Sequence, residues 1–132
     1  MDYINLLKSN NLKATVQRTA ILQSIHKAGH ISVEDIYEDI RSRYPTISLA
    51  TIYKNIVLML EHNVILEVPI NGEKSKYELK KDDHIHAICE LCGDIKDIKL
   101  TPERRELLTV KDFYLNYAQI NLYGICKKCQ SK

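Results

Sequence analysis

Two pairs of cysteines, each spaced C-x-x-C, constrain this chain more than any other feature. They are Cys89 with Cys92 and Cys126 with Cys129, and the sequence contains no other cysteine. A C-x-x-C turn presents two sulfurs to one ion, and zinc favours four thiolates in a tetrahedron. A thioredoxin-like redox pair, or buried and inert thiols, would not account for two such pairs. The pattern therefore predicts one structural zinc held by all four cysteines.

The remaining composition is that of an ordinary globular protein. The 132 residues are 45% apolar and 27% charged, and no stretch approaches the ~20 apolar residues of a membrane span. Residues 1–5 lack the basic and apolar segments that begin a signal peptide. Since neither a membrane span nor a signal peptide is recognised, we expect a cytoplasmic protein with no membrane partner. The net charge of +2 gives no electrostatic footprint for nucleic acid by itself.

The first half of the chain has the pattern of a winged helix-turn-helix. Apolar residues recur at helical spacing over 21–28, over 33–44 and from 48 to 60, and a short helix is expected over 3–8. Ser32-x-x-Asp35 is a capping-box pattern, and Ser48 is placed as the N-cap of the third strong helix. Residues 64–70 then alternate as a strand, Asn71-Gly72 is a type I′ hairpin signal, and a return strand is expected over 77–79.

The third strong helix offers candidate DNA contacts near its N-terminus. Four of its apolar residues are expected on the buried face, namely Leu49, Ile52, Ile56 and Met59. Four others are left near the outer face, namely Ala50, Thr51, Tyr53 and Lys54. The first turns of a recognition helix meet base edges, where alanine and threonine methyls suit thymine and a lysine suits phosphate or guanine. The alternative is an ordinary solvated helix face.

The pattern of the second half predicts a small α/β unit. Strands are expected over 84–88 and 94–98 around the first cysteine turn, and over 114–125 before the second. Thr101-Pro102 is a good helix start. We therefore predict an α+β chain with a winged-helix domain and charged hinge over 1–82 and a small domain over 83–132. A domain of some fifty residues is only marginally stable by itself, and zinc and an oligomer interface would supply the missing stability.

Two histidines on the first of these strands form a second candidate metal site. His84 and His86 are two residues apart, so both side chains leave the same face. Acidic residues are close in sequence, at Glu78, Asp82, Asp83 and Asp97. Imidazole nitrogens with carboxylate oxygens suit iron, manganese or zinc. The alternative is two solvated histidines, and the spacing alone leaves His30 as a solvated loop residue.

Several segments together resemble the ferric uptake regulator family of metal-dependent bacterial repressors over nearly the whole chain. They are LKATVQRTAIL (12–22), HISVEDIY (30–37), PTISLATIYKNI (45–56), HIHAICELCGDIKD (84–97) and YGICKKC (123–129). The resemblance implies a homodimer with N-terminal winged helices, a C-terminal dimerisation domain and a four-cysteine zinc. It also implies a regulatory metal site between the domains that closes the dimer onto palindromic double-stranded DNA.

Residue by residue, the resemblance implies five regulatory ligands, namely His30, Glu78, His84, His86 and Asp97. This revises the interpretation of His30 from a solvated residue to a ligand. Lys13 matches a basic residue that family members place in the minor groove, and Tyr53 matches a tyrosine of the recognition helix. An additional metal site of many iron and zinc sensors is expected to be absent, because Ile85 and residues 116–118 lack its ligands.

Asp97 directs the resemblance toward the peroxide-sensing branch, because iron-sensing members commonly have glutamate there. In that branch Fe(II) reacts with peroxide, and the oxidant attacks ligand imidazoles, by analogy His30 or His84, whereas Mn(II) supports DNA binding without reacting. Glu78 departs from the pattern, because peroxide sensors have aspartate at its position. The alternative within the family is a reversible iron or manganese uptake regulator.

Two alternatives come from other classes. A metalloenzyme could break down peroxide at His84 and His86, but the sequence shows no general base with a supporting partner, so we expect no enzyme activity. A zinc-stabilised interaction module would have no role on DNA.

Overall fold

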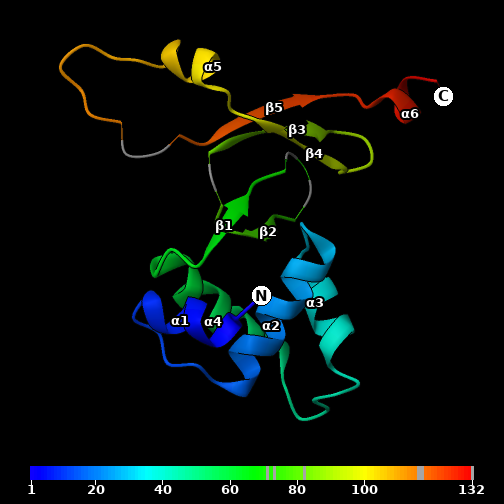
Figure 1. The fold of residues 1–132 in the computed structure, drawn as a ribbon. Helices are drawn as coiled ribbons and strands as arrows, with labels where there is room; N and C mark the ends of the chain where they lie inside the picture. The colour runs from blue at the N-terminus through cyan, green and yellow to red at the C-terminus, as the bar shows by residue number, and fades with distance from the viewer. Residues whose placement is uncertain (71, 73, 82, 116–117, 132) are drawn as a thin grey trace. The chain divides into compact units, whose positions relative to one another are not determined.

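A computed structural model describes the chain except for residues 71, 73, 82, 116–117 and 132 (Figure 1). The chain forms two compact units. The first contains Met1–Pro69 and Lys74–Lys80, and the second contains Ile70–Glu73 and Lys81–Lys132. Within the described residues, no helix has both the length and the apolar character needed to cross a membrane.

The first unit consists of four helices followed by a two-stranded hairpin. These are α1 (Tyr3–Ser9), α2 (Val16–Ala28), α3 (Val33–Ile40), α4 (Leu49–Glu61), β1 (Ile65–Val68) and β2 (Lys76–Leu79). The side chains of Thr15, Ser32 and Ser48 each accept a hydrogen bond from the backbone N–H three residues later, which caps α2, α3 and α4. This order of elements confirms the predicted winged helix.

Helices α2, α3 and α4 bury the core of this unit. Its most buried side chains are Leu7, Ile21, Leu22, Ile25, Ile36, Ile40, Ile52, Ile56 and Met59. Their spacing of three and four residues explains why the helical period was visible in the sequence. Truncating one of them to alanine would cost about 2–5 kcal/mol of stability.

Three local expectations for this unit were wrong. Leu49 is 42% exposed rather than buried, because it is the first residue of α4 and precedes the turns that pack on the core. Helix α3 ends at Ile40 and does not continue to Tyr44, because the N–H groups of Arg43 and Tyr44 both bond the Ile40 carbonyl and close the chain into a turn. Strand β1 is shorter than 64–70, because the Val64 N–H still bonds the Met59 carbonyl of α4. The expected Asn71-Gly72 turn involves a residue outside the described part of the chain.

The second unit is built on a three-stranded sheet. Its elements are β3 (His84–Cys89), β4 (Ile95–Lys99), α5 (Pro102–Glu106), β5 (Ile120–Gly124) and α6 (Lys127–Gln130). Strand β3 is central, antiparallel to β4 and parallel to β5. Thr101 caps α5 with Pro102 in its first turn, as predicted. The mixed helix and sheet architecture agrees with the predicted α+β class.

Strand β5 is shorter than the predicted strand over 114–125. It pairs with β3 only from Ile120, opposite Ile85, to Gly124, opposite Cys89. Before it, the backbone N–H of Ala118 donates to the Asp83 carboxylate at 3.3 Å instead of to a strand. The short α6, which contains the last cysteine, was not expected.

Candidate metal centres

The four cysteines gather at one end of the sheet of the second unit. Cys89 ends β3, Cys92 lies in the following turn, Cys126 precedes α6 and Cys129 lies within it. Their four sulfurs lie within 4.8 Å of one another, and the sulfurs of Cys92 and Cys126 are 3.7 Å apart. A tetrahedral zinc with Zn–S bonds of about 2.3 Å needs sulfurs about 3.8 Å apart. No disulfide joins these thiols, so the cluster is of the zinc type that the spacing predicted.

Local backbone geometry prepares this cluster for a cation. The backbone N–H groups of Cys126 and Cys92 donate to the Cys89 sulfur and lower its pKa to about 6, so it is a thiolate at neutral pH. The neighbouring Cys126 thiol and burial raise the pKa of Cys129 to about 12. Further negative charge is therefore disfavoured in this cluster unless a cation compensates it, which is the electrostatic setting of a metal site.

Strand pairing brings the two cysteine turns together. Cys89 lies opposite Gly124 in the parallel β3–β5 ladder, so the chain after β5 reaches the turn after β3. The Cys89 N–H bonds the Asp94 carbonyl and the Gly93 N–H bonds the Cys89 carbonyl, both at 2.9 Å, which closes the first turn. Gly93 has φ 78°, a backbone conformation that favours glycine.

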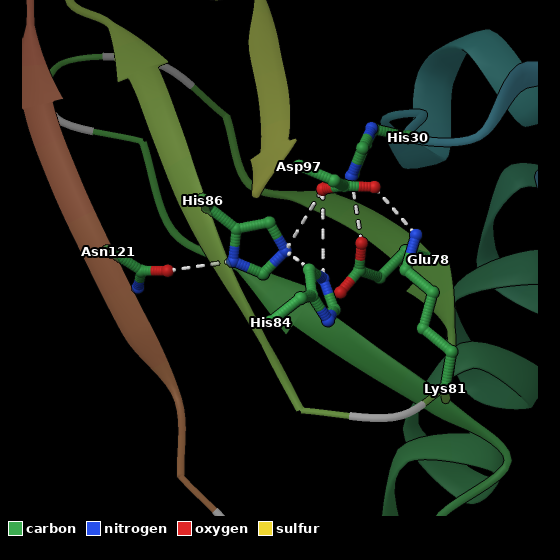
Figure 2. Close-up of polar contacts among 7 residues, drawn as sticks. All are labelled: His30, Glu78, Lys81, His84, His86, Asp97 and Asn121. Carbon is green, nitrogen blue, oxygen red and sulfur yellow. Dashed lines mark hydrogen bonds and ion pairs between the residues drawn. The ribbon is translucent and has the colours of Figure 1, made fainter. Parts of the chain in front are cut away.

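A second set of metal-ligand side chains lies on one face of the same sheet. Asp97 of β4 and Asn121 of β5 are the two strand partners of His86 on β3, so the three residues form a row across the sheet (Figure 2). His84 lies two residues before His86 and therefore shares this face. His86 is 1% exposed and His84 9% exposed, so the alternative of two solvated histidines is wrong.

The distances show that these side chains converge. The Nε2 atoms of His84 and His86 are 2.8 Å apart, and each is 3.7 Å from Oδ1 of Asp97. The other carboxylate oxygen of Asp97, Oδ2, accepts a hydrogen bond of 2.6 Å from Nζ of Lys81. Two imidazole nitrogens and one carboxylate oxygen thus point toward one place, and this donor set suits Fe(II) or Mn(II).

The first unit carries two further candidate ligands. Ile31, which follows α2, and Tyr77 of β2 exchange two backbone hydrogen bonds, of 3.1 and 2.8 Å. In such an antiparallel bridge the residue before one partner faces the residue after the other, which places His30 beside Glu78. His30 Nε2 lies 2.7 Å from Glu78 Oε2, and the Glu78 side chain is 1% exposed (Figure 2). A carboxylate this buried is retained where a cation or a charged hydrogen-bond donor compensates it.

Of the two other acidic residues that lie near the histidines in sequence, the structure places only Asp83. Asp83 pairs with Arg105, and Asp82 lies outside the described residues. Sequence reasoning missed two contacts to the ligands, those of Asn121 and Lys81. The alternation of strand β5 carried the only signal for Asn121, since its parallel pairing with β3 could not be read from the sequence.

The candidate DNA-contact residues lie on α4 and in the loop before α2. Ala50, Tyr53, Lys54 and Lys13 are exposed, whereas Thr51 is half-buried with its hydroxyl 2.9 Å from that of Ser48.

A side-chain network ties that loop to α4. Arg18 Nε donates to Asn55 Oδ1 and Arg18 NH1 donates to the Lys13 carbonyl, both at 2.9 Å. The Asn55 amide in turn donates to the Thr51 carbonyl at 3.0 Å. The loop that carries Lys13 is therefore held against the helix that carries the other candidates.

Comparison with known proteins places this chain in a family. The model of the ferric uptake regulator family matches residues 9–123. The peroxide-responsive repressor PerR of Staphylococcus saprophyticus is 33% identical over 135 residues, covering 99% of this chain and 91% of that protein. The solved structure of the Campylobacter jejuni peroxide stress regulator matches with a TM-score of 0.73 and 29% identity, over 98% of this chain and all of that one. The manganese-containing ferric uptake regulator of Pseudomonas aeruginosa matches with a TM-score of 0.80 and 26% identity, over 96% and 99%. The chain therefore belongs to the ferric uptake regulator family.

Proposed function

We propose that this chain is a metal-dependent DNA-binding repressor that responds to peroxide. It acts as a regulator rather than an enzyme, in the cytoplasm, as a homodimer on a palindromic operator. Family membership and relatives named as peroxide-responsive repressors support this proposal. The single observation that carries it is Asp97 beside His86, because that position distinguishes the peroxide-sensing pattern from the glutamate of iron sensors.

Two kinds of metal would serve two purposes. A structural zinc is held by Cys89, Cys92, Cys126 and Cys129. A regulatory Fe(II) or Mn(II) is bound by His30, Glu78, His84, His86 and Asp97. Two of these five ligands belong to the first unit and three to the second, so one ion bound by all of them would fix the units relative to each other. The DNA-binding residues 1–82 and the dimerisation residues 83–132 would then hold one geometry.

The response to peroxide would reside in the ligand histidines. Bound Fe(II) supplies the reduction of peroxide that generates a local oxidant. His30 and His84 present imidazoles at the site and are the expected positions of an added oxygen. An oxidised imidazole is a poorer ligand, so the metal is released and the closed dimer loses its support. Manganese in the same site would favour DNA binding without this reaction.

DNA would be read by α4 of each protomer. Ala50 and Thr51 would contact thymine methyls, Tyr53 bases or phosphate, and Lys54 phosphate or guanine. Lys13 would enter the neighbouring minor groove, a position supported by the Arg18 contacts to its loop. Two protomers related by a two-fold axis would read two half-sites of a palindrome.

The test measures binding to DNA as a function of metal and peroxide. Duplexes selected from a randomised library by the zinc- and manganese-loaded protein are labelled for fluorescence anisotropy. We expect tight binding with Mn(II) or anaerobic Fe(II), weak binding without either, and release by dilute peroxide only from the Fe(II) form. Equal binding without regulatory metal would contradict metal dependence. An Fe(II) form insensitive to peroxide would instead identify a reversible metal sensor.

A further inference from the structure

We propose that Asn121 is a positioning residue that fixes the tautomer of His86 and so prepares its Nε2 to bind metal. The inference rests on the proposed function, in that the metal is the regulatory ion described above. It starts from one contact, in which Asn121 Oδ1 lies 2.9 Å from His86 Nδ1 (Figure 2). Nothing in the family resemblance or in the motif spacing indicated this residue.

The chemistry of a neutral imidazole makes this contact consequential. One ring nitrogen carries the proton and the other carries a lone pair, and only the lone pair can bind a metal. The Asn121 side-chain oxygen is an acceptor, so Nδ1 of His86 must be the protonated nitrogen. Nε2 then keeps its lone pair, and this is the nitrogen that faces Asp97 Oδ1 and His84 Nε2.

Strand pairing gives the contact its geometry. Asn121 and His86 are direct partners in the parallel β3–β5 ladder, so their side chains leave the sheet side by side. His86 is 1% exposed, and so bulk water has little access to fix its tautomer in place of Asn121. Outer partners of this kind, which hydrogen-bond a metal ligand, account for about 10–100-fold in metal affinity in other proteins.

A consequence for His84 follows from the same assignment. Because Nε2 of His86 is an acceptor, Nε2 of His84 is the donor of the 2.8 Å hydrogen bond between them when no metal is bound. Metal entry therefore requires His84, and not His86, to change tautomer. The two histidines are distinguishable by their protonated nitrogens although they lie on the same strand.

The experiment uses the full-length zinc-loaded protein without regulatory metal, with ¹⁵N-labelled histidine. Long-range ¹H–¹⁵N spectra at pH 8 report the protonated nitrogen of each ring, and equilibrium dialysis measures Mn(II) affinity. Asn121→Leu removes the acceptor, and Asn121→Asp retains one at the same place. Zinc content of one ion per chain shows that the second unit is intact in each variant.

In the wild type we expect a proton on Nδ1 of His86. In Asn121→Leu we expect a mixture of tautomers and a 10–100-fold weaker Mn(II) affinity, with zinc retained. Asn121→Asp should keep the wild-type tautomer and bind Mn(II) at least as tightly as the wild type.

A proton on Nε2 of His86 in the wild type would overturn the proposal. So would an unchanged tautomer and affinity in Asn121→Leu. A wild type that binds no Mn(II) would instead remove the proposed regulatory site, while the spectra would still decide whether Asn121 sets the tautomer.

Discussion

The two candidate metal centres of this chain differ in their atoms and in the way the fold assembles them. The zinc-type cluster is made of sulfur alone, from two tight turns at one end of one sheet. The other candidate ligands are imidazole nitrogens and carboxylate oxygens. His84 and His86 converge with Asp97 on the sheet of the second unit, and His30 lies beside Glu78 in the first. Four thiolates saturate a zinc ion and close the site, whereas a mixed nitrogen and oxygen set suits iron or manganese.

This difference separates stability from sensing. A closed site within one small unit contributes its binding free energy to the folding of that unit. Under the proposed function, occupancy of the regulatory site would instead control binding to DNA. We therefore expect loss of a cysteine to affect folding, and loss of a regulatory ligand to affect metal affinity and metal-dependent DNA binding without affecting folding.

The largest effect is expected at the cysteines. Cys126→Ser should abolish zinc binding and dimerisation, because structural zinc contributes roughly 10–16 kcal/mol to folding in small zinc domains. Amide hydrogen exchange should show loss of protection in β3–β5 and retained protection in α2–α4. Ser131→Ala, two residues beyond the last cysteine, is the matched control. A stable zinc-free dimer would show that the zinc is not needed for folding or dimerisation.

Removal of a regulatory ligand should leave the fold intact. Glu78→Gln removes a buried charge but retains a side chain able to hydrogen-bond His30. Since outer partners of metal ligands already account for 10–100-fold in affinity, we expect a loss of at least about 100-fold in Mn(II) affinity. Zinc content and thermal unfolding should stay near the wild type. Glu67→Gln, on the neighbouring strand, should bind Mn(II) normally, and equal affinities for the two variants would remove Glu78 from the site.

Loss of a DNA contact should weaken DNA binding without affecting either metal centre. Lys54→Ala should weaken operator binding and reduce the salt slope by about one, the value for one lost phosphate contact on duplex DNA. Mn(II) affinity and zinc content should not change. Lys8→Ala on α1 is the control, and an unchanged slope in Lys54→Ala would show that Lys54 does not contact phosphate.

The smallest effect concerns a surface ion pair of the first unit that involves neither metal. Lys27 Nζ lies 2.8 Å from Asp39 Oδ1 and lowers the Asp39 pKa. The side chains are 64% and 25% exposed, so Asp39→Asn should cost under about 1 kcal/mol at pH 7. Because the folded pKa is the lowered one, this contribution is complete above about pH 4 and is lost as pH falls through the folded value.

Thermal unfolding followed by helical circular dichroism at pH 7 and pH 3 measures this difference. The gap between wild type and Asp39→Asn should shrink at pH 3, with Glu38→Gln as an exposed control. A gap that grows at pH 3 would contradict the sign of the pKa shift.

Structure that depends on residues close together in the sequence could be predicted, and structure that depends on distant residues could not. Helices α2 and α3 and both cysteine turns depend on residues a few positions apart, so period, caps and spacing revealed them. The predicted strand over 114–125 was too long because the start of β5 depends on pairing with β3 and on the Asp83 contact to Ala118.

The candidate regulatory ligands show the same limit of prediction from the sequence. His84 and His86 could be paired from spacing alone. His30 meets Glu78 through the bridge between Ile31 and Tyr77, 46 residues apart in the sequence, and no local pattern contains that information. Only the family resemblance implied a ligand role for His30, where physical reasoning from the sequence had left it solvated.

Under the proposed function, peroxide acts at the nitrogen and oxygen ligands and leaves the sulfur cluster intact. The most direct test loads the zinc-bound protein anaerobically with Fe(II) or Mn(II), adds dilute peroxide, and maps added oxygen by peptide mass spectrometry. We predict oxygen on His30 or His84 in the Fe(II) form only, with unmodified cysteines and loss of DNA binding. Unmodified histidines with intact metal-dependent DNA binding, or oxidised cysteines with zinc release, would contradict this account.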